Sequence, residues 1–283
     1  MIDEINKAFL KVKDALLSKG NLVPQLNPVA FILGGQPASG KSDLINVIQN
    51  SQTDKFLIIN GDEYRIYHPD YEILIKDIKN YSKETQPYSN IFTENLIREA
   101  IKNRYNLIVE GTMRNPDTPM KTAKLLRDNG YQVHAAIIAV HPKITELGVY
   151  ARFNKEVTLY GDGRLADINS HNDACVNLLT SADKLHETKC VDSIHIYATY
   201  PLREIHALNI KDNTWDNPEL PSTYIREERE RQMKDEIFLS DRINAGRKLS
   251  KTINPVLRLK VEKIVGDIRL FQIESNAAKL RIK

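Results

Sequence analysis

The stretch Gly35-Gln36-Pro37-Ala38-Ser39-Gly40-Lys41-Ser42 fits the pattern G-x-x-x-x-G-K-[ST] at every defined position. Glycines in this pattern let the backbone curl so that successive amides point at phosphate oxygens. The lysine ammonium adds positive charge at the β- and γ-phosphates, and the final hydroxyl can bind Mg²⁺. We therefore expect an ATP site with Ser42 as a metal ligand and with these nucleotide ligands: Gly35, Gln36, Pro37, Ala38, Ser39, Gly40, Lys41 and Ser42.

The sequence on either side of this loop predicts a strand before it and a helix after it. Residues 30–33 form a compact apolar run, as in a buried strand, and a helix is expected to begin near Ser42. Strand-like runs and helical stretches then alternate, which predicts an α/β fold of the P-loop kinase-like class, with a parallel sheet covered by helices on both faces. The later runs are 56–59, 106–109, 135–140 and 193–197, and the clearest helical stretches are 93–103 and 120–129.

The two ends of the chain lack the alternation of strand-like and helical segments. Apolar residues recur at helical spacing over 5–16 and stop at Gly20, which predicts an opening amphipathic helix. From residue 222 onward charged residues dominate, and helices are expected at 223–240 and 255–273. We therefore divide the chain into a kinase domain, residues 1–221, and a basic helical C-terminal extension, residues 222–283. The extension is either a solvated appendage or an arm that binds a partner.

Composition restricts the classes of function. The chain has 283 residues, 41% of them hydrophobic, and a net charge of +3, which is too small to indicate a nucleic acid or a membrane as partner. No apolar run approaches the length that spans a bilayer, and the first residues do not look like a signal peptide, so the cytoplasm is the expected location. Cys175 and Cys190 match no metal or redox spacing and are interpreted as reduced structural thiols.

Polar residues follow the second and third apolar runs, where ligands bind in parallel sheets. Asp62 follows the second run, and its carboxylate could orient Mg²⁺ or accept the proton of an attacking hydroxyl. Its structural alternative is a helix N-cap. Glu110, Thr112 and Arg114 follow the third run and could hold a polar substrate, or could form a surface ion pair and a cap.

Two arginines further along the chain are candidates for the charge on the migrating phosphate. Arg152 lies on a helix that follows His141-Pro142, and Arg164 lies in the glycine-containing segment 160–164. Phosphoryl transfer requires positive groups around the γ-phosphate. On sequence spacing alone, a simple surface charge is the favoured interpretation of either arginine.

Taken in order, these segments resemble the zeta toxins of bacterial toxin–antitoxin systems. The resemblance covers roughly residues 30–200, with nearly fixed spacing. Besides the phosphate loop it rests on Asn60-Gly61-Asp62, His68-Pro69-Asp70-Tyr71, Pro87-Tyr88-Ser89-Asn90, Thr93-Glu94, the segment 105–114, Leu147-Gly148, Arg152 and Arg164.

The resemblance implies a kinase that phosphorylates the 3′-hydroxyl of the amino sugar of UDP-N-acetylglucosamine and thereby poisons cell-wall synthesis. It implies that Asp62 is the general base, that Lys41 and Ser42 hold phosphates and Mg²⁺, and that Arg152 and Arg164 clamp the γ-phosphate. Glu94, Glu110, Thr112 and Arg114 match positions that hold the sugar nucleotide. A cognate antitoxin protein is implied as a partner.

Three departures from the family pattern accompany this resemblance, at Ala38, at Gly61 and in the region around Asp162-Gly163. Ala38 stands where many members have glycine, and we expect it to keep a negative φ. Gly61 precedes Asp62 where a polar residue is common.

Two other functions remain open. The first is a P-loop kinase for another hydroxyl, such as an antibiotic; a nucleic-acid 5′ end is disfavoured because Glu94 and Glu110 are acidic. The second is a nucleotide-dependent switch without catalysis, which the presence of Asp62, Arg152 and Arg164 disfavours.

Overall fold

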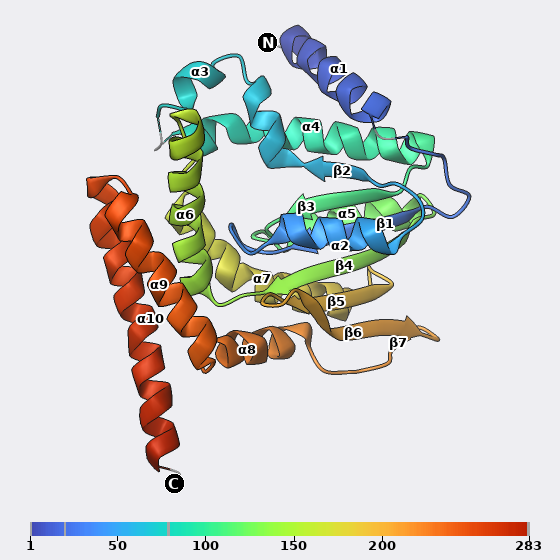
Figure 1. The fold of residues 1–283 in the computed structure, drawn as a ribbon. Helices are drawn as coiled ribbons and strands as arrows, with labels where there is room; N and C mark the ends of the chain where they lie inside the picture. Colours follow the sequence, from blue (N-terminus) through green and yellow to red (C-terminus); the bar gives the residue numbers. More distant parts are fainter. Residues whose placement is uncertain (1, 20, 78–79, 282–283) are drawn as a thin grey trace.

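A seven-stranded sheet forms the centre of the protein in the computed structural model, which describes residues 2–19, 21–77 and 80–281 (Figure 1). The strand order is β2-β3-β1-β4-β5-β6-β7. The strands are β1 (Val29–Gly34), β2 (Leu57–Asn60), β3 (Leu107–Gly111), β4 (Gln132–Ala139), β5 (Ser193–Ala198), β6 (Arg203–Lys211) and β7 (Thr214–Trp215).

The first five strands are parallel, as the sequence predicts, but the edge of the sheet is not. β6 runs antiparallel to β5, and β7 runs antiparallel to β6. The sequence analysis identified the five parallel strands and did not identify the two antiparallel strands at this edge. The reason is that β6 is only partly covered, so its sequence lacks the continuous apolar run that identifies a buried parallel strand.

Helices cover both faces of the sheet, as predicted. Successive residues of β4 point to opposite faces: Ala135 and Ile137 belong to one apolar cluster, Ala136 and Ile138 to the other. The first cluster is formed with α1 (Ile2–Lys19), α4 (Tyr81–Asn103), α5 (Asp117–Asp128) and α7 (Ile168–Thr188). The second is formed with α2 (Lys41–Ser51), α6 (Pro142–Tyr160), α9 (Glu236–Thr252) and α10 (Pro255–Arg281).

The opening helix packs on the body of the protein. Val12 is buried, the ring of Phe9 lies 5.9 Å from that of Phe92 on α4, and Lys13 forms an ion pair with Glu99 at 3.0 Å. The predicted helix over 5–16 is therefore confirmed as part of α1. None of the helices in the described ranges combines the length and apolarity needed to cross a membrane.

The C-terminal region begins with a helix that belongs to the core. The prediction of a single helix over 223–240 is wrong, because α8 (Pro221–Gln232) ends there and α9 begins at Glu236. Asp235 caps α9, and its carboxylate accepts the backbone N–H of Phe238 at 3.0 Å. α8 packs on β4 and β5, and its Ile225 is fully buried. The division at residue 221 stays a prediction, although α8 extends the core past it.

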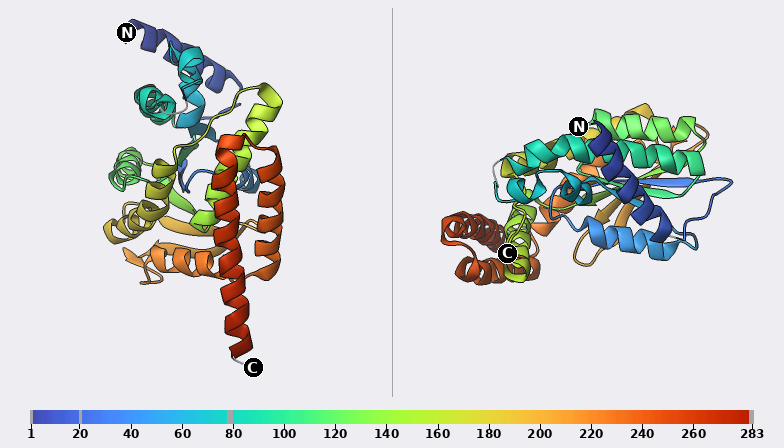
Figure 2. Two further views of the ribbon diagram at one scale, coloured as in Figure 1. Left: turned by 90° about the vertical axis from the view of Figure 1, so that its left-hand side faces the viewer. Right: turned by 90° about the horizontal axis from the view of Figure 1, so that it is seen from above.

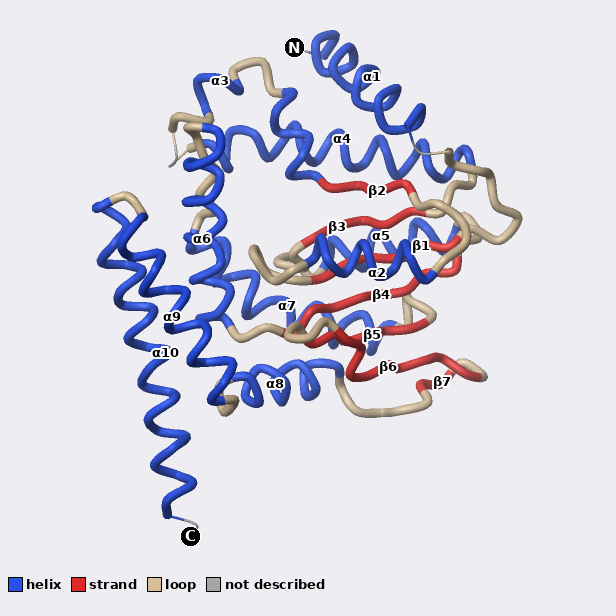
Figure 3. The backbone as a smooth tube through the Cα atoms, viewed as in Figure 1, coloured by secondary structure: helices blue, strands red, loops and turns tan. Residues whose placement is uncertain are grey.

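α9 and α10 form an antiparallel hairpin beside α6, at the carboxyl edge of the parallel strands (Figures 1 and 2). Figure 3 shows the short α3 (Tyr71–Leu74) and the loops after β1, β3 and β4 on this same side. A 3₁₀ helix, η1 (Gly61–Tyr67), follows β2 there. The residues predicted for chemistry therefore meet at one edge.

Candidate functional site

The phosphate loop joins β1 to α2 at the centre of this edge. Gly40, at φ +95, turns the chain into the first residue of α2, a conformation that favours glycine. Lys41 is 9% exposed, and its ammonium donates to the carbonyl oxygens of Gly35 at 2.8 Å and Gln36 at 3.3 Å. Burial lowers the pKa of Lys41, and the charges of Glu110 and Asp62 oppose this. The ammonium group thus lies on the loop, where the phosphate oxygens of a bound nucleotide can replace these carbonyl oxygens as its hydrogen-bond acceptors.

Ala38, in the middle of the phosphate loop, has a left-handed backbone conformation. Its φ is +63, so the expectation of a negative φ is wrong. A side chain at Gly148 on α6 would place its Cβ 3.0 Å from the Cβ of Ala38. The absence of a side chain at Gly148 therefore leaves room for the methyl group of Ala38. A glycine at position 38 would have no methyl group and would not need this room.

Asp62 lies one residue after the start of η1, and it is not the cap of that helix. The cap is Asn60, whose side-chain oxygen accepts the N–H of Asp62 at 3.1 Å. The Asp62 carboxylate is instead bound by two arginines, with Arg65 Nε 3.0 Å from Oδ1 and Arg164 2.5 Å from Oδ2. The side chain stays 44% exposed. The N-cap alternative is thereby excluded, and the carboxylate is accessible.

Arg65 is a residue of this site that the sequence analysis missed. It is 5% exposed, and its guanidinium also donates to Thr85 Oγ1 at 2.7 Å and Gln86 Oε1 at 2.7 Å, both on α4. Partial burial opposes ionisation of Asp62, but the charges of Arg164 and Arg65 hold the pKa of Asp62 well below its ordinary value. The sequence did contain one signal for this contact: Arg65 lies three residues after Asp62, a spacing at which the two side chains can form an ion pair.

Arg152 and Arg164 come together through Glu156, a second residue that the sequence analysis missed. Glu156 Oε2 accepts the backbone N–H of Arg164 at 2.7 Å, and Glu156 Oε1 lies 3.7 Å from Arg152 Nε. Burial and the nearby Arg164 charge lower the pKa of Arg152. Both arginines keep a buried Nε without a hydrogen-bond partner. The charges of both arginines also act on Lys41 of the phosphate loop, so they are not isolated surface charges.

The predicted substrate residues differ in how deeply they are buried, and Glu110 is the one whose charge interacts with that of Asp62. Glu110 pairs with Asn60 across β2 and β3 and lies 3.8 Å from the Lys41 ammonium, and burial raises the pKa of its carboxyl group. Thr112 is half-buried, while Glu94 and Arg114 are exposed. Their assignment to a sugar nucleotide stays a prediction.

Close packing against α4 explains why a glycine stands at position 61, independently of the substrate. A Cβ at this position would lie 2.6 Å from Ser89 Oγ and 3.0 Å from Thr93 Oγ1, and Ser89 Oγ donates to the Gly61 carbonyl at 2.7 Å. The glycine lets α4 approach the end of β2. This close approach brings the segment that carries Glu94 next to Asp62.

The donors at the site fit a Mg²⁺ ion that arrives with the nucleotide. Within the described part of the chain, no group of three His, Cys, Asp or Glu side chains could hold a metal. Ser42 is exposed on the first turn of α2, and the adjacent Lys41 lies within the influence of the Asp62 and Glu110 carboxylates. Mg²⁺ usually takes one or two protein ligands and completes its shell with phosphates and water.

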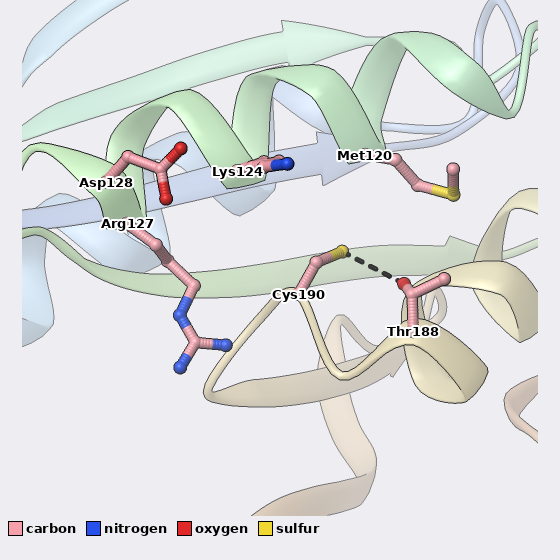
Figure 4. A pocket seen from close by; sticks show the side chains of 6 residues that line it. All are labelled: Met120, Lys124, Arg127, Asp128, Thr188 and Cys190. Atoms are coloured by element: carbon pink, nitrogen blue, oxygen red, sulfur yellow. Dashed lines mark hydrogen bonds between the residues drawn. The ribbon is translucent and has the colours of Figure 1, made fainter.

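A separate hollow lies between α5 and the end of α7 (Figure 4). Its lining includes Lys124, Arg127 and Cys190, and Thr188 Oγ1 lies 3.3 Å from the Cys190 sulfur. Both cysteines are free thiols, and burial raises the pKa of each. The two sulfurs do not form a disulfide, in line with the expectation of thiols, and the lining of the hollow contains no residue of the phosphate loop.

Comparison with known proteins agrees with this geometry. The sequence model of the family described as Zeta toxin matches residues 13–242, which is most of the chain. The chain belongs to the zeta toxin family. It is 36% identical over 177 residues to Toxin zeta of Enterococcus hirae and 34% identical over 172 residues to Toxin PezT of Streptococcus pneumoniae.

These zeta toxin relatives are matched over part of their length. The alignment with the Enterococcus hirae toxin spans 60% of each chain, and that with PezT spans 60% of this chain and 68% of PezT. A solved structure from the characterisation of the PezAT chromosomal toxin–antitoxin system of Streptococcus pneumoniae superposes with a TM-score of 0.68 at 25% identity, over 80% of this chain and 86% of that one. The AvrRxo1-ORF1:ORF2 complex, at 13% identity and a TM-score of 0.51 over 94% of this chain and 82% of that one, shares the fold alone.

Proposed function

We propose that this protein is an ATP-dependent phosphotransferase that phosphorylates the 3′-hydroxyl of the amino sugar of UDP-N-acetylglucosamine, and that it acts as a toxin on cell-wall synthesis. The observation that carries the proposal is Asp62, an accessible carboxylate held by Arg65 and Arg164 at the mouth of the phosphate loop. The acceptor is inferred from membership of the zeta toxin family. Because ATP and nucleotide sugars are cytoplasmic metabolites, we place the reaction in the cytoplasm.

The two arginines on Asp62 suggest how binding of ATP prepares the base. Arg164 neutralises Oδ2 in the free protein, and an incoming γ-phosphate offers this guanidinium a stronger anionic partner. Departure of Arg164 leaves Oδ2 open to the acceptor hydroxyl, while Arg65 keeps Oδ1 in place. Loss of one positive neighbour also raises the proton affinity of the carboxylate, which a general base requires.

Phosphoryl transfer then requires few further groups. The acceptor oxygen attacks the γ-phosphorus, its proton passes to Asp62, and ADP leaves with the bridging oxygen. Lys41, Arg152 and Arg164 spread the negative charge that develops on the phosphoryl oxygens. Bound Mg²⁺, held by Ser42 and the phosphates, would neutralise charge on the β- and γ-phosphates.

The test is an assay of phosphate transfer with ATP, Mg²⁺ and UDP-N-acetylglucosamine, with the product located by phosphorus and proton NMR. We expect a 3′-phosphorylated sugar, which is lost in Asp62→Ala and retained in Glu63→Ala, a matched change at the neighbouring exposed carboxylate. We also expect Asp62→Ala and Arg164→Ala to abolish toxicity on expression in bacteria. ATP turnover with another hydroxyl, such as an antibiotic, and none with this sugar would refute the acceptor.

We also propose that a cognate antitoxin protein holds the enzyme inactive. Support comes from the solved PezAT toxin–antitoxin system, whose structure superposes on most of this chain. An antitoxin that covers the phosphate loop would compete with ATP. Unchanged ATP affinity in the complex would contradict this mode of inhibition.

A further inference from the structure

A buried arginine of α8 lies against the phosphate loop without an acidic partner. Arg229 is 8% exposed, and burial lowers the pKa of its guanidinium, an effect that no carboxylate of the described residues opposes. Glu228, its neighbour in sequence, is paired with Arg231 at 2.7 Å instead. Buried charges in folded proteins are normally paired, so this unpaired cation requires an explanation.

The guanidinium of Arg229 is held by two neutral groups. Its Nη1 donates to the carbonyl oxygen of Cys175 on α7 at 2.9 Å, and its Nη2 donates to Gln36 Oε1 at 3.4 Å. Its Nε is buried and has no hydrogen-bond partner. These contacts fix the orientation of the side chain, but they do not balance its charge.

The titratable groups around Arg229 provide no free negative charge. Burial lowers the pKa of His171, and the charge of Arg229 lowers it further. Burial raises the pKa of the Cys175 thiol to about 11, so both side chains are neutral at pH 7. Glu146, whose charge acts on His171 and Cys175, is itself paired with Lys143 at 3.1 Å. The positive charge of Arg229 therefore remains unbalanced in the free protein.

Gln36 connects Arg229 to the part of the loop that holds phosphate. Gln36 is a fully buried residue of the loop, and its side-chain Nε2 donates to the Val140 carbonyl, just after β4, at 2.7 Å. Its main-chain carbonyl accepts the backbone N–H of Ser39 at 3.2 Å and the Lys41 ammonium at 3.3 Å. A displaced Gln36 would therefore disturb a carbonyl that holds both the loop and its lysine.

We propose that Arg229 is a positioning residue of the nucleotide site: it holds Gln36 from behind the loop, and the phosphates of the bound nucleotide balance its charge. The inference rests on the proposed function, which supplies ATP as the ligand. A buried charge acts over a longer range than a surface charge, because water and salt screen it less. The charge of Arg229 can thus reach the phosphates without touching them, and α8 takes part in the site although it follows residue 220.

The experiment measures two quantities on the full chain: the Kd of ATP by calorimetry, and the Tm of the nucleotide-free protein. Arg229→Met is expected to raise the Kd of ATP about tenfold through the lost charge. The Tm is expected to stay the same or to rise, because an unpaired buried charge has been removed. Arg229→Lys, which keeps the charge, should retain most of the affinity. Arg226→Met removes an exposed charge of the same helix and is the matched control, with little effect on the Kd.

Several results would overturn the inference. An unchanged Kd in Arg229→Met, an equal loss in Arg226→Met, or a loss that Arg229→Lys does not restore excludes a role for the buried charge. If Arg229→Met does not fold, Arg229→Gln takes its place, and the failure of both neutral variants to fold shows that the arginine serves packing alone. Failure of the proposed function is distinguishable, because ATP binding is measured without an acceptor. A chain whose ATP affinity depends on the Arg229 charge, but which transfers no phosphate to the sugar, loses the acceptor and keeps the positioning residue.

Discussion

Asp62 is held by two arginines that differ in how firmly the fold fixes them. Arg65 is buried and bonded to α4, whereas Arg164 belongs to a loop and retains an unpartnered Nε. A carboxylate with one fixed and one transferable partner can be positioned in the free enzyme and released when ATP arrives. Because the two arginines lower the pKa of Asp62, the same arrangement also makes the stability of the protein depend on pH.

We expect the contribution of the Asp62 charge to stability to decline in acid. The folded pKa of Asp62 is lowered, so its charge stabilises the fold above the unfolded pKa of about 4 and loses this effect as the pH falls toward the folded value. Urea unfolding of wild type and Asp62→Asn at pH 7 and pH 3.5 measures it. Relative to Asp62→Asn, the free energy of unfolding of wild type should be lower at pH 3.5 than at pH 7. Glu63→Gln is the control, and its difference from wild type should not show this change. A difference that does not change with pH would contradict the assigned ion pairs.

The sequence could predict the residues of this site but not all of their partners. Lys41 and Ser42 follow from the loop pattern, and Asp62 from its place after a strand. Arg65 and Glu156 were missed because their roles depend on contacts across the fold, to α4 and to the loop of Arg164. The sign of φ at Ala38 was also beyond the sequence, since it depends on how α6 meets the loop.

At the scale of elements, α6 is packed directly on the phosphate loop and carries Arg152. The contact is made by Gly148 against Ala38, two residues that no local rule would connect. α8 holds the neighbouring strand end: Gln232 donates to the Ala139 carbonyl at 2.8 Å and accepts from the His141 N–H at 2.9 Å. The loop therefore depends on helices that come later in the chain.

The contact between α6 and the loop predicts a specific rescue. Gly148→Ala should destabilise the protein by about 1–3 kcal/mol, because its methyl group would press on that of Ala38. Ala38→Gly removes the opposing methyl group and a left-handed alanine, so the double variant should recover most of the loss. Thermal unfolding of the four proteins gives the coupling energy. If the two changes simply add, the helix and the loop are not in this contact.

The edge of the sheet shows which elements remain hard to predict. Five parallel strands were identified by apolar runs because both of their faces are covered. β6 is exposed or only partly buried at every position except Leu208, and β7 has two residues, so neither produces such a run. The boundary between α8 and α9 was missed because Asp235 is a cap inside an otherwise helical pattern.

At the scale of the whole molecule, the C-terminal hairpin is joined to the kinase core through α6. A Cβ at Gly246 of α9 would lie 2.3 Å from Val265 of α10 and 3.4 Å from Leu147 of α6, so the three helices meet closely there. Lys143 of α6 also pairs with Asp267 of α10 at 2.9 Å. These contacts make an independent appendage a poor description of residues 236–281.

We therefore expect the full chain to unfold in one cooperative transition. Trp215 is the single tryptophan, and its Nε1 donates to the His186 carbonyl at 2.7 Å, so its fluorescence reports on the sheet edge. Far-UV circular dichroism reports on all helices, the hairpin included. Coincident urea curves from the two signals would show that core and hairpin share one stability. A circular dichroism transition that precedes the loss of Trp215 fluorescence would instead show that the hairpin of α9 and α10 unfolds separately from the core, as an independent extension would.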